Sequence, residues 1–357
     1  MNKKRILALG VVTVLLGLLI YLQVRTWKNF DWAVFWSRTD HVNLLGLLGG
    51  VVLTYLAYVL RAVRWRIFLK PVCETTTARL VGPQFVGFTA LALLGRAGEM
   101  VRPYIIAKKE RLTFTSQIAV WGVERIFDMG AFGVLLIISL FSPDVQALPF
   151  YHHWITVHGI RLDLGLRDAA FVLMALVGSL IVGAVVVGRW GERVGQFFYG
   201  LFAGFAPKVA HHLREKIHSF SEGLKTIHDF SSAMQLVAVS LVMWVLTSGS
   251  YYCITHAYPG ELRSLTVPDQ VVLMGSAMVG SMLQLPAVGG GTQLATISML
   301  HSGFGVEQEL AVSCGILIWA ISFMSVIPVG LALARREHLS LRAVAEAEEK
   351  AEAALAE

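Results

Sequence analysis

Residues 118–141 read IAVWGVERIFDMGAFGVLLIISLF, an apolar run that holds three charged side chains. A helix needs about 20 residues to cross the roughly 30 Å hydrocarbon core of a membrane, and this run is long enough. Counted from Thr113, Glu124 lies about 16 Å along the helix, close to the middle of the membrane. Each charged group at that depth costs about 2.5 to 3.5 kcal/mol, so Glu124, Arg125 and Asp128 need partners or water.

Five further apolar blocks have lengths near that of a membrane span. The chain is 55% hydrophobic and 15% charged, whereas soluble domains are about 25% charged. We therefore predict an all-α integral membrane protein with about six spanning helices. The block at 6–24 lacks a small-x-small cleavage site, which favours a retained anchor over a signal peptide. The five blocks are 6–24, 44–60, 169–188, 236–254 and 310–334.

The distribution of basic residues predicts the orientation of the chain. Most of the 30 Lys and Arg residues fall in alternate loops, and such loops remain on the cytoplasmic side. Both termini are then cytoplasmic, in the plasma membrane. The net charge is +6, but the positive residues lie between apolar blocks rather than on one soluble face. This distribution argues against nucleic-acid binding.

Two apolar stretches do not fit a simple crossing. Residues 80–94 lie between two basic loops that are both expected in the cytoplasm, and they reach only about 22 Å as a helix. We therefore predict a re-entrant hairpin that enters from the cytoplasm, turns at 95–98 and returns through 101–107. The last helix must also end on the cytoplasmic side. The apolar segments 271–285 and 294–300 therefore cannot both cross separately, and we predict that they form a second hairpin that enters from the external side. The two opposed half-helix hairpins are expected to face each other near the midplane.

The two halves of the chain have similar spacing. From Gly98 to Arg125 is 27 positions, and from Gly291 to Ile318 is again 27. Glycine-broken segments at corresponding places in two halves are typical of inverted-repeat transporters. The sequence leaves open whether this is a true inverted repeat or a coincidence of spacing.

The tip of the first hairpin is expected near the charged trio, and together they would form a six-member cluster. One interpretation is a structural ion-pair network that fixes the hairpin to the helix. The other is a binding site in which arginine guanidinium groups hold a phosphate. Glycines at the second tip either bring the backbone close to a substrate or let two half-helices pack. The candidate substrate-binding residues are Arg96, Glu99, Arg102, Glu124, Arg125, Asp128, Gly289, Gly290, Gly291 and Gln293.

The sequence contains no H-E-x-x-H, G-x-S-x-G or P-loop motif, so we expect no enzyme activity and no cofactor. The three cysteines are far apart and the histidines are irregularly spaced, which predicts no metal site. Residues 1–334 are expected to form one polytopic membrane domain, with an amphipathic surface helix at 207–230. Residues 335–357 would be a short charged cytoplasmic tail.

Two motifs resemble a known family. Gly95-Arg96-Ala97-Gly98-Glu99 with Arg102, followed by Glu124-Arg125 with Asp128, is similar to the signatures of the lysylphosphatidylglycerol synthase transmembrane-region family, also called flippase-like domain proteins. Pro286 and the glycines 289–291 look like that family's P-G-G-x-G segment, although Thr292 stands where many relatives carry Glu. The resemblance implies a membrane domain that in some members moves an aminoacylated phospholipid between leaflets, here without the cytoplasmic transferase domain of other members.

The leading functional hypothesis is a translocator of a phospholipid or a lipid-linked anionic metabolite, whose head group binds at the charged cluster. One alternative is a membrane-embedded lipid-modifying enzyme subunit, with Glu124 or Asp128 as general base. Another is a non-transporting scaffold for lipid or cell-envelope enzymes. The expected partners are membrane lipids, a second copy of the chain, and a separate lipid-modifying enzyme.

Overall fold

The computed structural model describes residues 31–152, 154–157, 160–163, 165–202, 204, 211, 230–283 and 290–336. The predicted anchor at 6–24, nearly all of the predicted surface helix at 207–230, and the tail beyond Arg336 lie outside the described residues. The first half contains α2 (Trp32–Thr39), α3 (Leu44–Leu69), α4 (Thr77–Leu94), the 3-10 turn η1 (Gly95–Met100), α5 (Val101–Glu110), α6 (Phe114–Ser139), α7 (Pro143–Gln146), β1 (Trp154–Val157), β2 (Ile160–Asp163) and α8 (Leu166–Phe202).

The described elements of the second half are all helical. It contains α10 (Phe230–His256), η2 (Glu261–Ser264), α11 (Val267–Gly280), η3 (Ser281–Leu283), α12 (Gly291–Ser298), the π-helical turn η4 (Met299–Gly303), α13 (Gln308–Trp319), the π-helical turn η5 (Ala320–Met324) and α14 (Val326–Arg336).

The protein is a helical multi-pass membrane protein. Among the described residues, four segments are long and apolar enough to cross a membrane: Leu44–Leu69, Thr77–Leu94, Ser231–His256 and Gln308–Arg335. The described elements are helical apart from one antiparallel hairpin, in which Trp154 pairs with Asp163. The sequence prediction of an all-α chain missed this hairpin, whose four-residue strands are rich in the β-branched and aromatic residues that favour strands.

The long helices α3 and α10 form the centre of the structure and run antiparallel. A Cβ added at Gly46 would lie 2.8 Å from the Cβ of Ala257, and one at Gly50 would lie 2.8 Å from Ile254 Cγ1. Small residues therefore let the two backbones approach closely, as is common between helices in membranes. The hydroxyls of Thr54 and Ser250 lie 2.9 Å apart, which adds a buried polar contact to the pair.

The first predicted hairpin has the expected turn. Gly95 has φ 72°, a left-handed value that suits glycine, and α5 then packs back along α4. Gly98 lies against the backbone of Ala90, and Gly87 lies against Arg102, so the two helices run antiparallel. The helix α4 begins three residues earlier than expected, because the Thr76 hydroxyl caps its first turn. It has 18 residues rather than fifteen.

The two segments of the second predicted hairpin form α11 and α12, which pack against each other. A capping box at Thr266 and Asp269 starts α11, and α11 ends at Gly280, which lies against the carbonyl of Gly291 in α12. Pro286 and Gly289, which belong to the predicted turn, lie outside the described residues, as does Gln284 just before it.

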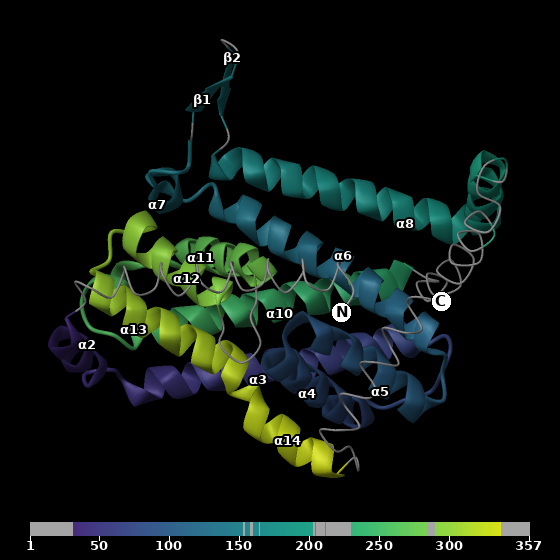
Figure 1. Cartoon of the computed structure of the whole chain (residues 1–357), viewed down its shortest axis with the longest axis horizontal. Helices are drawn as coiled ribbons and strands as arrows, with labels where there is room; N and C mark the ends of the chain where they lie inside the picture. The colour runs from purple at the N-terminus through teal and green to yellow at the C-terminus, as the bar shows by residue number, and fades with distance from the viewer. Residues whose placement is uncertain are drawn as a thin grey trace, which may run out of the picture.

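The two hairpins lie at opposite ends of the central pair (Figure 1). Phe85 of α4 contacts Tyr58 in the second half of α3, whereas Gln270 of α11 donates a hydrogen bond to Thr255 near the end of α10. The last helical segment reaches both hairpins: Gly315 of α13 packs on Ile297 of α12, and Gly330 of α14 packs on Thr89 of α4.

Candidate functional site

The helix α6 carries both acidic groups of the site on one face. Its first turn is capped by Thr113, whose hydroxyl accepts a hydrogen bond from the Ser116 amide. Glu124 and Asp128 are four residues apart and therefore lie on the same side of the helix. They are 0% and 5% exposed. Carboxylates at this degree of burial require charged partners.

The main partner is Arg64 of α3. Its Nη2 donates to Glu124 Oε1 at 2.5 Å and its Nη1 donates to Asp128 Oδ1 at 2.6 Å. Nη1 also donates to the Ser240 hydroxyl of α10 at 3.0 Å. One fully buried guanidinium therefore joins three helices through bonds to two carboxylates of α6 and one hydroxyl of α10, a geometry for which arginine is well suited.

Arg102 of α5 is the second partner and ties the first hairpin to α6. Its Nη2 forms a close ion pair with Glu124 Oε2, and its Nη1 donates to Gln84 Oε1 of α4 at 3.0 Å. The guanidinium carbon lies 4.6 Å from the centre of the Trp65 ring. This approach requires Gly87, because a Cβ there would collide with Arg102.

Two further arginines lie at the edge of this network. Arg61 Nη1 is 3.7 Å from Asp128 Oδ2, and its guanidinium carbon lies 5.0 Å from the centre of the Phe88 ring. Arg125 Nη2 is 3.7 Å from Asp128 Oδ2 and 3.8 Å from Glu124 Oε2, and its side chain is 41% exposed. The predicted contact from Arg125 to Asp128 is confirmed, but it is long, so Arg125 is held only loosely.

The network contains more positive than negative charge. Four guanidinium groups face the two carboxylates of Glu124 and Asp128. Two positive charges are therefore in excess. In a medium of low dielectric constant such an excess favours the binding of an anion.

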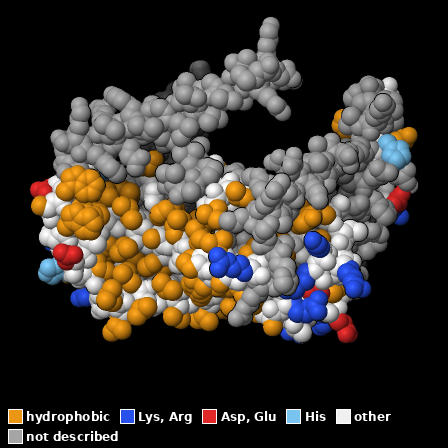
Figure 2. Space-filling view, turned by 60° about the horizontal axis from the view of Figure 1, so that its bottom comes forward, with side chains coloured by type: hydrophobic (Ala, Val, Ile, Leu, Met, Phe, Trp, Pro, Cys, Tyr) orange, Lys and Arg blue, Asp and Glu red, His pale blue; other side chains and the backbone are white. Residues whose placement is uncertain are grey.

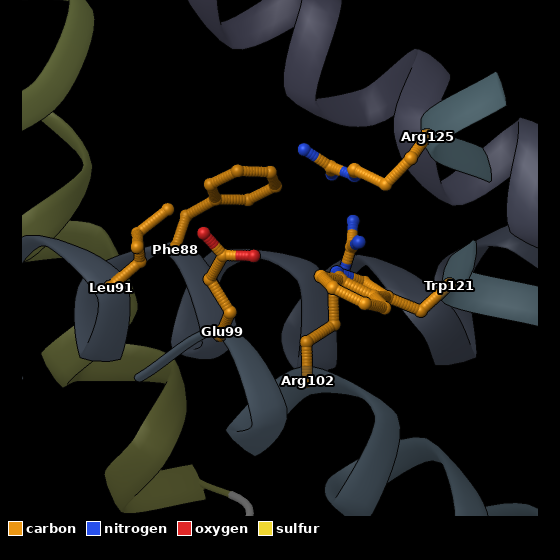
Figure 3. A pocket seen from close by; sticks show the side chains of 7 residues that line it. Phe88, Leu91, Glu99, Arg102, Trp121 and Arg125 are labelled. Atoms are coloured by element: carbon orange, nitrogen blue, oxygen red, sulfur yellow. The ribbon is translucent and has the colours of Figure 1, made fainter. Parts of the chain in front are cut away.

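A hollow of about 290 Å³ opens beside this network. Figure 3 shows Glu99 and Arg102 on one side of it and Arg125 reaching in from the other. Phe88, Leu91 and Trp121 supply apolar walls, and Gly87 completes the lining. The residues come from α4, η1, α5 and α6, so the first hairpin and the charged helix build the hollow together.

Most of the predicted cluster is brought together in this way. Arg102, Glu124 and Asp128 form its buried part, and Glu99 and Arg125 face the hollow. The side chain of Arg96 lies outside the described residues.

The sequence prediction ended an apolar block at residue 60 and so placed Arg61 and Arg64 in the basic cytoplasmic loop before residue 80, which is wrong. They lie inside α3, which continues to Leu69. The acids of α6 compensate their charge, so the helix can bury them. Their spacing of three residues, which places both on one helical face, was the available signal.

The residues predicted at the second hairpin lie elsewhere. Gly290 has φ 58° and precedes α12, and Gly291 packs against Gly280. Gln293 is half-buried in α12. None of these three residues lines the hollow beside the charged network, and Gly289 lies outside the described residues.

Comparison with known proteins adds three findings. Residues 5–330 match the family model described as the lysylphosphatidylglycerol synthase TM region. The chain is also 23% identical over 314 residues to a UPF0104 membrane protein of Methanothermobacter thermautotrophicus, covering 80% of this chain and 83% of the relative. It is 23% identical over 313 residues to the glycosyltransferase AglD of Haloferax volcanii, covering 80% of this chain but 48% of that protein.

Proposed function

The chain belongs to the lysylphosphatidylglycerol synthase TM region family, and we propose that it translocates a phospholipid or a lipid-linked anionic metabolite across the membrane. The head group would bind in the hollow, beside Arg102 and Arg125. One observation carries this proposal: a half-exposed arginine with only long ion pairs faces a hollow next to a network that already has excess positive charge.

A purely structural role accounts for only part of the network. Arg64 and Arg102 make short contacts with buried carboxylates, as a network that fixes helix positions would require. Arg125 does not fit this description, because its side chain is 41% exposed and its ion pairs with Glu124 and Asp128 are 3.8 and 3.7 Å long. Ionisable groups inside membranes that lack full compensation are functional candidates, and Arg125 is suited to bind a phosphate oxygen.

Translocation also needs a path, for which we propose two opposed re-entrant hairpins in an inverted repeat. The order α3, α4, α5, α6 corresponds to α10, α11, α12, α13 with α14. The return helix α5 has 10 residues, or about 15 Å, so it starts from roughly half the depth of the membrane. In addition, 56% of the residues in the apolar stretch of α4 are buried within the protein, against 22% for α3. This burial suits a segment enclosed by protein.

The orientation proposed for the chain places both termini in the cytoplasm. Figure 2 shows apolar side chains over the middle of the face, with most of the Lys and Arg side chains gathered toward one end. Exposed basic residues at the ends of α3 and α5 include Arg66, Lys70 and Lys108. Basic residues are retained on the cytoplasmic side of membranes, so the first hairpin would open toward the cytoplasm.

Lipid movement in vesicles tests the proposal. The purified protein would be reconstituted with acyl-labelled lipids, whose head groups are intact, and movement would be followed by chemical quenching from outside. Arg125→Leu removes one charge-assisted contact, worth about 1.5 to 3 kcal/mol, and should slow movement roughly 10- to 100-fold. Arg66→Leu, an exposed position on α3, is the matched control. Equal rates for wild type and Arg125→Leu would reject the assignment.

A second candidate function is that of a lipid-handling subunit for a separate enzyme. The relative named as a glycosyltransferase matches this chain over about half of its own length, which is the observation that favours it. Product formed from a labelled lipid carrier by the purified chain alone would indicate an enzyme. If deletion of the gene stopped transport while the purified chain moved no lipid, a scaffold that recruits another transporter would be indicated instead.

A further inference from the structure

The hollow also contains a carboxylate that has no ion-pair partner in the described part of the chain. Glu99 lines it from the turn η1, and among the described residues no cation lies within ion-pairing distance of its carboxylate. The turn is held in place because Gly98 packs against the backbone of Ala90 and Leu91. Figure 3 shows the Glu99 carboxylate pointing into the same space that Arg125 enters.

The positive groups around the hollow are not equally available. Arg102 is committed to Glu124 and Gln84, and its side chain is 5% exposed. Arg125 is 41% exposed and makes only long ion pairs. Among the side chains that the structure describes, the hollow therefore offers a ligand one available cation, Arg125, and one available anion, Glu99.

This pairing limits the ligand chemistry. An anionic head group without a positive charge would place a second negative charge beside Glu99 and leave that carboxylate uncompensated. A head group that carries both a phosphate and an ammonium compensates both side chains at once. The hollow holds about 290 Å³ of empty space, part of which is open to the surroundings, so the head group that enters it must be small.

The aromatic walls distinguish between kinds of ammonium. Quaternary ammonium groups are usually recognised by open aromatic faces. Here the Phe88 ring already has the guanidinium groups of Arg61 and Arg102 within 5.3 Å of its centre, and Trp121 has Arg125 at 5.7 Å. A primary ammonium, which donates hydrogen bonds to a carboxylate, fits this hollow better than a trimethylammonium.

We infer that the hollow binds a small zwitterionic lipid head group of the phosphoethanolamine type, with its phosphate on Arg125 and its primary ammonium on Glu99. This inference rests on the proposed function, since it names the head group that the translocator would accept. It makes Glu99 a specificity-determining residue.

Binding and movement of three acyl-labelled lipids test the inference. Lipids with phosphoethanolamine, phosphoglycerol and phosphocholine head groups would be compared in detergent for binding and in vesicles for movement. Wild type should prefer phosphoethanolamine. Glu99→Gln should lower the affinity for the phosphoethanolamine lipid roughly tenfold, as expected when one charge-assisted contact is lost. The affinity for the phosphoglycerol lipid should stay the same or increase. Glu74→Gln, at an exposed loop position, is the matched control.

The two readouts separate the inference from the proposed function. A phosphoethanolamine preference that Glu99→Gln removes supports the head-group assignment even if no lipid moves, and the translocator proposal alone then fails. Movement of all three lipids at equal rates, unchanged by Glu99→Gln, overturns the head-group assignment and keeps the translocator. Glu99→Asp retains the charge and should keep part of the preference; if it behaves like Glu99→Gln, a role for the charge is rejected.

Discussion

Mutation of Arg64 should mainly reduce the stability of the protein, whereas mutation of Arg125 should mainly reduce lipid movement. The Arg64 side chain is 0% exposed and makes ion pairs of 2.5 and 2.6 Å. Arg64→Met would leave Asp128 with contacts of only 3.7 Å, and breaking a buried pair costs about 3 to 5 kcal/mol. The Arg125 side chain is 41% exposed and its ion pairs are long, so Arg125→Met should cost roughly 0 to 1 kcal/mol of stability.

Equilibrium unfolding in mixed micelles, followed by tryptophan fluorescence, would measure the two losses of stability against Arg66→Met as a surface control. Lipid movement would be measured on the same samples. We expect Arg64→Met to unfold early, and Arg125→Met to remain folded but to move lipid slowly. If Arg125→Met lost as much stability as Arg64→Met, Arg125 would belong to the structural network, and the assignment of the hollow as a binding site would be refuted.

Three further changes have defined outcomes. Gly98→Ala should destabilise the protein by about 1 to 3 kcal/mol, because its Cβ would meet the backbone of α4, while Gly200→Ala, in open space, should be neutral in the same unfolding assay. Tyr58→Phe removes a hydrogen bond of 2.9 Å to a carbonyl of η5 and should cost about 1 to 3 kcal/mol. Burial and the nearby Glu110 carboxylate raise the pKa of the Cys73 thiol, so less reactive thiolate is present at pH 8. In a variant whose other cysteines are alanine, Glu110→Gln should lower that pKa and speed maleimide labelling, and an unchanged rate would contradict this cause.

The turn after residue 94 could be predicted because basic loops on both sides of 80–94 favour the cytoplasm, and the structure places a turn at Gly95–Met100. The length argument was wrong, since α4 starts at Thr77 and is long enough to cross a membrane. The ion pairing of the acids of α6 could be predicted because an uncompensated charge is costly inside a membrane. These inferences used only local properties of the chain.

The cations opposite those acids could not be identified by the same reasoning. Positive residues at a helix end are usually markers of the cytoplasmic side, and Arg61 and Arg64 were read in that way. Their burial depends on carboxylates of α6, 60 or more positions along the chain. The start of α4 was also missed, because it is set by the hydroxyl cap of Thr76 and not by hydropathy.

The hollow itself could not be predicted, because it depends on how closely the hairpin packs. Gly87 and Gly98 bring α4 and α5 together, and this packing leaves the space between Glu99 and Arg125. The two glycines were visible in the sequence, but their contacts depend on the three-dimensional pairing of the two helices.

The most direct measurement is a cryo-EM map of the protein in a lipid bilayer that contains the phosphoethanolamine lipid. The account predicts head-group density in the hollow, with its phosphate against the Arg125 guanidinium and its nitrogen against the Glu99 carboxylate. A map in which protein side chains close the hollow, or in which Arg125 forms short ion pairs with Asp128 and Glu124 and faces no lipid, would contradict it.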